Sequence, residues 1–298
     1  MSTSRPSGVI AAVATAIDLS GGPDTARSTA LGRFLLEHGC DGLNVLGTTG
    51  EATSFSLAQR RGVMTAYAQA GLPMHRLLVG TGAAALADAV ALTRHAADLG
   101  FAGALLLPPF YYRDVPDEGL LRVLDAIIEA TASPAIPIYL YHFPALSGVP
   151  WHLGLIARLI ATFKDRVVGL KDSSGDLDFA RAAAALGEGF DVFPSSEAVL
   201  GEARRVGFAG CISATVNLNA DLCARAYWQA DAAALAAATA VRGLFANQPV
   251  VPGVKSVLAH IHGEPAWARV MPPLEPASPA DATEAVAGYE AVRARLAA

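Results

Sequence analysis

Short apolar segments alternate with longer amphipathic segments eight times along the chain. Most of the short segments are apolar throughout instead of at every second residue, which is typical of strands covered on both faces. Successive short segments are about 20–35 residues apart, the length of one right-handed βα unit. Eight such units close into a (β/α)8 barrel, the fold that we predict. The expected strands are residues 8–17, 41–49, 76–82, 103–109, 137–143, 167–172, 190–195 and 210–215.

Helical periodicity fills the intervals between these strands and the whole C-terminal part of the chain. In the helix expected over 56–71, Ser56 and Gln59 have the spacing of a capping box. We predict that residues 1–230 form the barrel and residues 231–298 a C-terminal helical extension. A doubly wound open sheet is the alternative fold, and it is disfavoured because the chain lacks a GxGxxG motif.

Composition excludes several classes of partner. The net charge is only −5, and the lysines and arginines are scattered, which argues against binding of nucleic acid or an anionic membrane. No apolar run approaches the roughly 18–20 residues that span a bilayer, and the first residues do not resemble a signal peptide. We expect a soluble, cytoplasmic protein. The three cysteines (Cys40, Cys211, Cys223) form no CxxC pair and are expected to be buried, reduced thiols.

The chemistry of a (β/α)8 barrel lies at the carboxyl ends of its strands. Hydroxyl groups, phenols and a single amine are expected there, without a ring of carboxylates or histidines, and no HxxxH pattern predicts a metal site. These strand ends are Thr15, Thr48, Thr49, Thr81, Pro109 to Tyr112, Tyr141, Lys171, Ser195 and Ser213.

Lys171 is one of only three lysines in the chain, and it follows the apolar strand residues VVGL. An amine in that position is poorly solvated in its charged form, which favours the neutral nucleophile needed for a Schiff base with a carbonyl substrate. The alternative is a lysine that reaches solvent or pairs with Asp172. Of the other two, Lys164 is expected in solvent and Lys255 near the start of a helix.

Tyr141 ends the neighbouring strand, where its phenol could transfer protons for the amine. The alternative is a tyrosine that only packs, which is the role we expect for Tyr139, one layer deeper. The LGTTGE turn (46–51) follows the second strand, and its backbone N–H groups could bind an anion such as a carboxylate. The alternative is a plain turn with Gly50 in the left-handed region.

Three motifs occur in order: GTTGE, YxxPxxxG around Tyr141, and GLKDSSGD around Lys171. Together they resemble the dihydrodipicolinate synthase/N-acetylneuraminate lyase superfamily of class I, pyruvate-dependent aldolases. The resemblance covers about residues 8–265. It implies a (β/α)8 barrel with a C-terminal helical domain, in agreement with the fold predicted above.

The resemblance also implies a role for each site residue. Lys171 would form the Schiff base, so no other cofactor is expected, and Tyr141 would relay protons. Thr48 and Thr49 would bind the pyruvate carboxylate, and Thr49 would link Tyr141 to a second tyrosine, Tyr111, which a neighbouring subunit of a homodimer or homotetramer would supply. Tyr112 is the adjacent candidate for that tyrosine, and Ser195 and Ile212 would line the pocket by main chain.

The second-substrate residues differ from the two best-known members. Dihydrodipicolinate synthases have a carboxylate-binding arginine where this chain has Leu146. The acidic pair of the N-acetylneuraminate lyases appears here as Glu197 and Ala198. The strand-one motif also reads ATAI in place of the usual threonine-proline-phenylalanine.

The function expected is therefore reversible cleavage of a 2-keto-3-deoxy acid to pyruvate and an aldehyde that the sequence does not identify. The alternatives are dihydrodipicolinate synthesis from pyruvate and aspartate semialdehyde, and Schiff-base dehydration of a keto-deoxy sugar acid. A barrel that binds a keto acid without catalysis is the remaining alternative, and joint retention of the site residues argues against it.

Overall fold

The computed structural model describes residues 5–297. Its eight parallel strands form a nearly closed barrel. The strands follow the order β7-β6-β5-β4-β3-β2-β1-β8, and the Ala209 N–H donates to the Val192 carbonyl (2.9 Å) across the remaining gap. The predicted (β/α)8 barrel is confirmed. The strands are β1 (Gly8–Ala12), β2 (Gly42–Val45), β3 (Leu77–Gly80), β4 (Gly103–Leu106), β5 (Ile138–His142), β6 (Val167–Asp172), β7 (Asp191–Pro194) and β8 (Gly210–Ser213).

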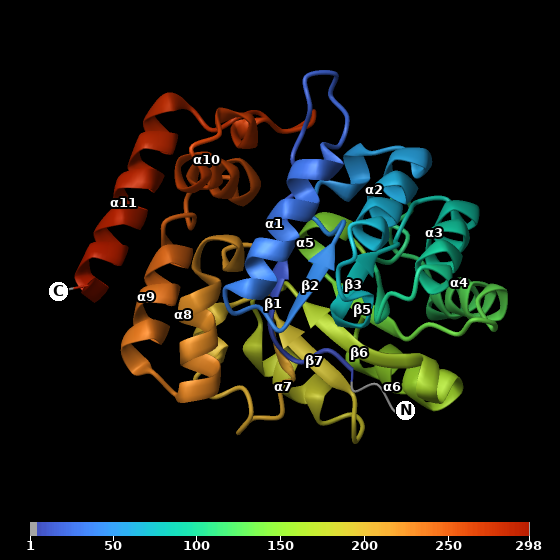
Figure 1. The fold of residues 1–298 in the computed structure, drawn as a ribbon. Coiled ribbons are helices and arrows are strands. Elements are labelled where there is room, and N and C mark those ends of the chain that lie inside the picture. The colour runs from blue at the N-terminus through green and yellow to red at the C-terminus, as the bar shows by residue number, and fades with distance from the viewer. Residues whose placement is uncertain (1–4, 298) are drawn as a thin grey trace.

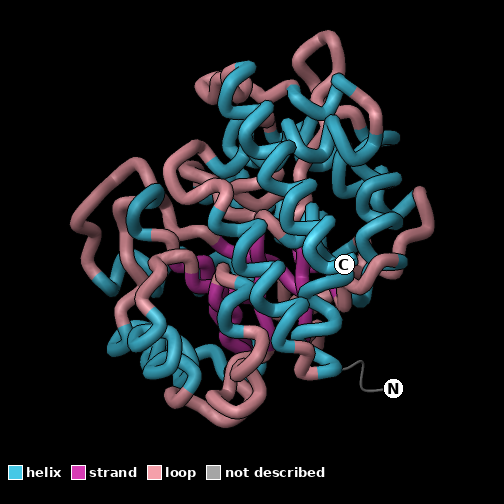
Figure 2. The backbone as a smooth tube through the Cα atoms, turned by 90° about the vertical axis from the view of Figure 1, so that its left-hand side faces the viewer, coloured by secondary structure: helices cyan, strands magenta, loops and turns pink. Residues whose placement is uncertain are grey.

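Helices surround the strands, as Figures 1 and 2 show. The capping box at the start of α2 is present, since the Ser56 side chain accepts from Gln59 N and the Gln59 side chain accepts from Ser56 N. The barrel helices are α1 (Thr25–Glu37), α2 (Leu57–Gln69), α3 (Leu86–Asp98), α4 (Asp117–Ala130), the short α5 (Pro144–Ser147), α6 (Leu153–Phe163), α7 (Leu177–Ala184) and α8 (Val216–Gln229).

Side chains of each strand point alternately into the barrel and toward the helices, which separates the core into two clusters. The outer cluster lies between strands and helices and holds most of the large apolar residues. Tyr139 fills the interior as predicted, because β4 and β6 carry glycine beside its ring: a Cβ on Gly103 or Gly169 would lie 2.6 Å from ring atoms. The inner cluster consists of Ile10, Ala12, Leu78, Leu105, Tyr139, Tyr141, Val168, Phe193 and Ile212.

Several strands are shorter at their carboxyl ends than the sequence predicts. β1 ends at Ala12 instead of residue 17, and β2 at Val45 instead of residue 49. The residues beyond β1 leave the sheet but stay buried, with Ala14, Ala16 and Ile17 at most 2% exposed. Their apolar character therefore reflects burial in the rim and not membership of the barrel sheet; Ile17 forms only an isolated bridge with Pro23.

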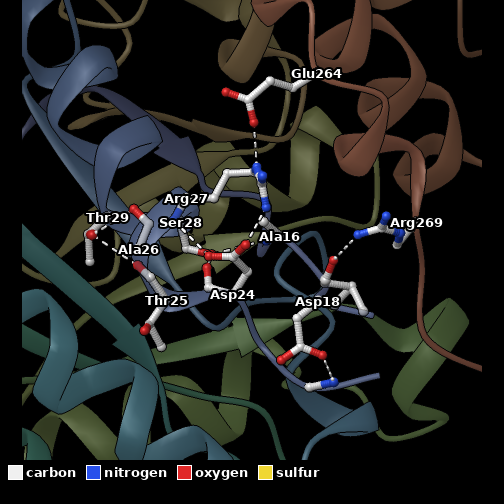
Figure 3. Close-up of polar contacts among 12 residues, drawn as sticks. Ala16, Asp18, Asp24, Thr25, Ala26, Arg27, Ser28, Thr29, Glu264 and Arg269 are labelled. Atoms are coloured by element: carbon white, nitrogen blue, oxygen red, sulfur yellow. Dashed lines mark hydrogen bonds and ion pairs between the residues drawn. The ribbon is translucent and has the colours of Figure 1, made fainter. Parts of the chain in front are cut away.

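The C-terminal part of the chain contains α9 (Ala232–Gly243), α10 (Val250–His262) and α11 (Pro279–Ala297). Two polar contacts attach it to the start of α1 and the loop before it (Figure 3). Arg27 Nε lies 2.5 Å from Glu264 Oε2, and Arg269 Nη1 donates to the Ile17 carbonyl (3.3 Å). The helical extension is confirmed, whereas the exact division between residues 230 and 231 stays a prediction.

The three cysteines are buried and form no disulfide. Burial raises the pKa of all three thiols, so none is a ready nucleophile. Within residues 5–297, no helix combines the length and the apolar character needed to cross a membrane.

His142 predicts a pH-dependent stability. Its ring lies on the helix side of β5, stacks on Phe179 with centroids 4.4 Å apart, and accepts the Trp151 N–H at Nδ1 (3.1 Å). Burial lowers its pKa to about 4, against about 6.5 in an unfolded chain. Between these two values only the unfolded chain binds the proton. Stability should therefore fall by about 2–3 kcal/mol as the pH drops from 7.5 to 4.5.

Comparison of the parent protein with His142→Asn isolates this effect, because Asn keeps an acceptor near the Nδ1 position and does not titrate. In urea unfolding at pH 7.5 and 4.5, the parent should lose more stability than the variant over that interval. Equal losses would show that His142 is not the group responsible.

Candidate active site

Lys171 and Tyr141 are paired neighbours on β6 and β5, and both side chains lie on the inner side of the barrel. They are 3% and 4% exposed, and Lys171 Nζ lies 4.4 Å from the centroid of the Tyr141 ring. Among the described residues, no carboxylate forms an ion pair with Lys171. The amine therefore lies against a π-face in a largely apolar setting, next to a phenol that can exchange protons.

Asp172 does not pair with Lys171, because successive residues of a strand point to opposite faces. Its Oδ1 accepts the Ser174 N–H (3.0 Å), and burial raises its pKa. Ser174 Oγ in turn accepts the Asp176 N–H, and the Asp176 carboxylate caps the N-terminus of α7. The DSSGD segment is thus a chain of turns and caps that joins β6 to α7.

Thr48 is the threonine that contacts Tyr141. Its Oγ1 lies 3.0 Å from Tyr141 Oη, and the residue itself is exposed. The contact with Tyr141 expected from Thr49 is therefore made by Thr48, whereas Thr49 is buried and has no hydrogen bond to Tyr141. The left-handed residues of this turn are Leu46 and Glu51, both with φ 54°, and not Gly50.

A cavity of about 470 Å³ opens at this rim and brings most of the predicted site residues together. Lys171, Tyr141, Thr48 and Thr49 share it with the three predicted pocket residues Ser195, Ile212 and Leu146. The full lining is Thr48, Thr49, Glu51, Thr53, Ser54, Tyr141, Phe143, Leu146, Lys171, Ser173, Ser195, Ile212, Ala214, Arg242, Pro249, Val250, Val251, Pro252, Pro273 and Leu274.

Glu197, a predicted substrate-binding residue, does not line this cavity and is fully buried. The prediction was wrong because the protein itself satisfies the carboxylate. Oε1 accepts the hydroxyls of Ser213 (2.8 Å) and Thr215. Oε2 lies 3.4 Å from Nη1 of Arg242, a cavity residue on α9 that the sequence reasoning missed. A signal was present, since Arg242 is the only charged residue in the α9 sequence AAALAAATAVRG.

Glu51 and Lys255 form a second polar feature that was missed. Lys255 lies in the middle of α10 instead of near a helix start, and it is fully buried with its Nζ against Glu51 Oε1. Burial lowers the pKa of Lys255, and the Glu51 carboxylate opposes that shift. Lys255 also donates to the Arg269 carbonyl (2.7 Å), and Glu51 Oε2 accepts the Met271 N–H (2.6 Å). The pair thus joins the GTTGE turn to the C-terminal segment that covers the cavity.

Tyr111 lies outside the cavity of its own chain. It is 76% exposed and Tyr112 is 72% exposed, with their rings packed edge to face at 5.3 Å between centroids. Lys164 is exposed, as predicted. Residues 5–297 contain no group of three or more His, Cys, Asp or Glu side chains arranged to hold a metal ion.

The amine of Lys171 and the phenol of Tyr141 lie at the carboxyl-terminal rim of a (β/α)8 barrel, where enzymes of this fold have their active sites. The model of the dihydrodipicolinate synthetase family matches residues 5–290, and the chain belongs to that family.

Individual proteins agree with this assignment. An uncharacterized DapA-like lyase of Chloroflexus aurantiacus is 34% identical over 97% of this chain and 98% of its own. The crystal structure of dihydrodipicolinate synthase from Agrobacterium tumefaciens matches with a TM-score of 0.89 and 27% identity, covering 96% of this chain and 99% of that one. The N-acetylneuraminate lyase of Proteus mirabilis shares the fold, with a TM-score of 0.83 at 23% identity over 97% of this chain and 99% of that one.

Proposed function

We propose that the protein is a class I aldolase that reversibly cleaves a 2-keto-3-deoxy acid to pyruvate and an aldehyde. One observation carries the proposal: Lys171 Nζ lies against the Tyr141 ring, and Tyr141 Oη contacts Thr48, within a single cavity. A buried amine that lacks an ionic partner among the described residues is suited to attack a carbonyl carbon. Family membership supports the same chemistry.

Schiff-base formation begins when the neutral amine of Lys171 adds to the C2 keto carbon. Tyr141 gives a proton to the former carbonyl oxygen, and after a second proton transfer that oxygen leaves as water. The product is a protonated imine between Lys171 and C2. Thr48 is exposed and bonded to Tyr141, which connects the phenol to solvent protons.

Cleavage follows when the C4 hydroxyl loses its proton and its oxygen forms the aldehyde carbonyl. The C3–C4 bond breaks, and its electron pair moves to the imine nitrogen to give an enamine. A proton then adds at C3, and one water molecule hydrolyses the imine to release pyruvate and the free amine. The imine is the electron sink, so the proposed route needs no metal or organic cofactor.

Trapping with borohydride tests this proposal. Incubation with pyruvate and borohydride should leave a pyruvate-derived mass on the Lys171 peptide, and turnover of a keto-deoxy acid should release pyruvate. The proposal fails if the protein stays unlabelled under conditions in which a known lyase is labelled.

Leu146 argues against dihydrodipicolinate synthesis in the arrangement of those synthases, because it lines the cavity with an apolar side chain where their arginine would bind the aspartate semialdehyde carboxylate. Product analysis distinguishes the remaining outcomes. Labelling of Lys171 with substrate loss but without pyruvate release would indicate a dehydratase. Binding of pyruvate without adduct or turnover would indicate a keto-acid-binding barrel.

Tyr141→Phe removes only the phenolic hydroxyl. Proton transfer by a positioned group contributes about 10²–10⁴-fold, so pyruvate release should fall by a factor in that range. Borohydride trapping should still label Lys171, but more slowly. Unchanged turnover would remove Tyr141 from the mechanism.

Tyr111 is the residue proposed to complete the site of a neighbouring subunit. The chain should therefore form at least a dimer in light scattering, and Tyr111→Phe should reduce turnover without changing the unfolding temperature. Tyr112→Phe serves as the neighbouring control. A fully active monomer would contradict this arrangement.

A further inference from the structure

Arg242 is the one positively charged cavity residue that the proposed chemistry leaves unused. The charged residues in the lining are Glu51, Lys171 and Arg242. Glu51 is occupied by Lys255 and the Met271 N–H, and Lys171 forms the Schiff base in the proposed mechanism. Most other lining residues are apolar or carry hydroxyls, so Arg242 is the remaining cationic side chain among the described lining residues.

Glu197 fixes one edge of the Arg242 guanidinium. Nη1 lies 3.4 Å from Glu197 Oε2 and 3.3 Å from Ser213 Oγ. Both distances exceed the roughly 2.7–2.9 Å of a tight charge-assisted bond. The contact with Glu197 therefore orients the Arg242 side chain but leaves the guanidinium able to bind a further anion.

The other edge of the guanidinium remains available. Within residues 5–297, Nε and Nη2 of Arg242 have no hydrogen-bond partner, and the side chain is 40% exposed. A planar guanidinium with a free edge matches the two oxygens of a carboxylate. Since the described lining residues place no second free cation beside it, a carboxylate fits this edge better than the more highly charged phosphate group.

The position of Arg242 indicates which end of the substrate it contacts. Thr48 and Thr49, proposed to bind the pyruvate carboxylate, follow β2, and Lys171 and Tyr141 lie on β6 and β5. Arg242 contacts Ser213 at the end of β8, a different part of the rim. A carboxylate bound at Arg242 would therefore be a second one, distinct from the pyruvate carboxylate at Thr48 and Thr49.

We propose that Arg242, oriented by the buried Glu197, selects a second substrate that carries a carboxylate at its far end. The full substrate is then a 2-keto-3-deoxy dicarboxylic acid, and the aldehyde product carries the second carboxylate. This rests on the proposed aldolase function and names its substrate class. Arg242 on α9 would thus bind the second carboxylate, which the apolar side chain of Leu146 on α5 cannot bind.

Matched substrates test the proposal. Two pairs differ only at the terminal group: 4-hydroxy-2-oxoglutarate with 4-hydroxy-2-oxopentanoate, and 2-keto-3-deoxyglucarate with 2-keto-3-deoxygluconate. In at least one pair, the parent protein should cleave the dicarboxylate with the higher kcat/KM. Arg242→Gln should lower that value by about 100-fold. The kcat/KM of the neutral-tailed partner, which has no carboxylate for Arg242 to bind, should change by less than about 3-fold. Arg242→Lys should restore part of the loss.

Arg225→Gln is the control, because it breaks an ion pair with Asp231 (2.6 Å) and lies outside the cavity lining. The Arg225→Gln variant should leave kcat/KM unchanged for both substrates of each matched pair. The proposal is overturned if the parent protein prefers the neutral tail at both chain lengths, or if Arg242→Gln lowers both members equally.

Pyruvate trapping distinguishes failure of the role proposed for Arg242 from failure of the proposed aldolase function. If the parent protein and Arg242→Gln both label at Lys171 but terminal groups are not distinguished, only the role of Arg242 fails. If Arg242→Gln loses pyruvate labelling while the parent keeps it, Arg242 binds the pyruvate carboxylate and the proposal is wrong. If the parent itself is not labelled, the aldolase function fails and the inference fails with it.

Discussion

A Lys171→Met variant is expected to lose pyruvate release by about 10⁴-fold or more, the order of loss when a covalent nucleophile is removed. The same variant should unfold at the temperature of the parent protein or above it. Lys171 is 3% exposed and has no carboxylate partner among the described residues. An unpaired amine in such a site costs stability, and methionine replaces it with an apolar chain of similar length.

Pyruvate release, intact-protein mass after borohydride and thermal unfolding measure this prediction together. Lys164→Met is the matched control, because Lys164 is exposed and should be replaceable without loss of activity or labelling. Residual turnover above about 1% of the parent value in Lys171→Met would contradict a covalent role. That cut-off is two orders of magnitude above the residual turnover that we expect. A large fall in the unfolding temperature would show that Lys171 stabilises the fold.

A Lys255→Met variant should lose about 3–5 kcal/mol of unfolding free energy, because it leaves the Glu51 carboxylate buried without its cation. Both side chains are fully buried, so solvent cannot compensate the remaining charge. The double variant Lys255→Met/Glu51→Gln should recover much of the loss, since Gln keeps an acceptor for the Met271 N–H.

Urea unfolding of the single and double variants measures this coupling. The control is Arg27→Gln, which breaks two partly exposed ion pairs, with Glu264 and Asp24, and should cost at most about 1 kcal/mol for each. A loss below about 1 kcal/mol in Lys255→Met would place the buried pair in the same class as surface pairs. Equal losses in the single and double variants would show that the two residues are not coupled.

Local sequence was sufficient to predict the barrel, because strand burial, helix caps and the spacing of βα units all depend on neighbouring residues. The glycines at 103 and 169 show what it missed. Their role depends on the Tyr139 ring of the strand between them, a contact between residues far apart in the sequence. The predicted strands were too long at their carboxyl ends for a related reason. Ala14 and Ile17 are buried in the rim without belonging to the barrel sheet.

The site divides in the same way. Lys171 and Tyr141 were predictable because strand ends converge on one rim and each motif contains its own functional residue. Which of the two adjacent threonines contacts Tyr141 depends on the three-dimensional course of the turn, and the structure shows that it is Thr48. Glu197 was assigned to substrate because the hydroxyls that satisfy it, on Ser213 and Thr215, come from a later segment.

The sequence alone determined the eight βα units, the scarce lysine at the end of the sixth strand and the phenol beside it, because these follow from periodicity and short motifs. Tertiary structure decided which charged groups line the cavity and which are paired inside the protein. Glu197 is buried against Ser213, Thr215 and Arg242, Lys255 is buried against Glu51, and Arg242 of α9 lies at the end of β8. The physical reason is that a buried charge must find a partner wherever the chain supplies one, and here the partners lie 45 and 204 residues away.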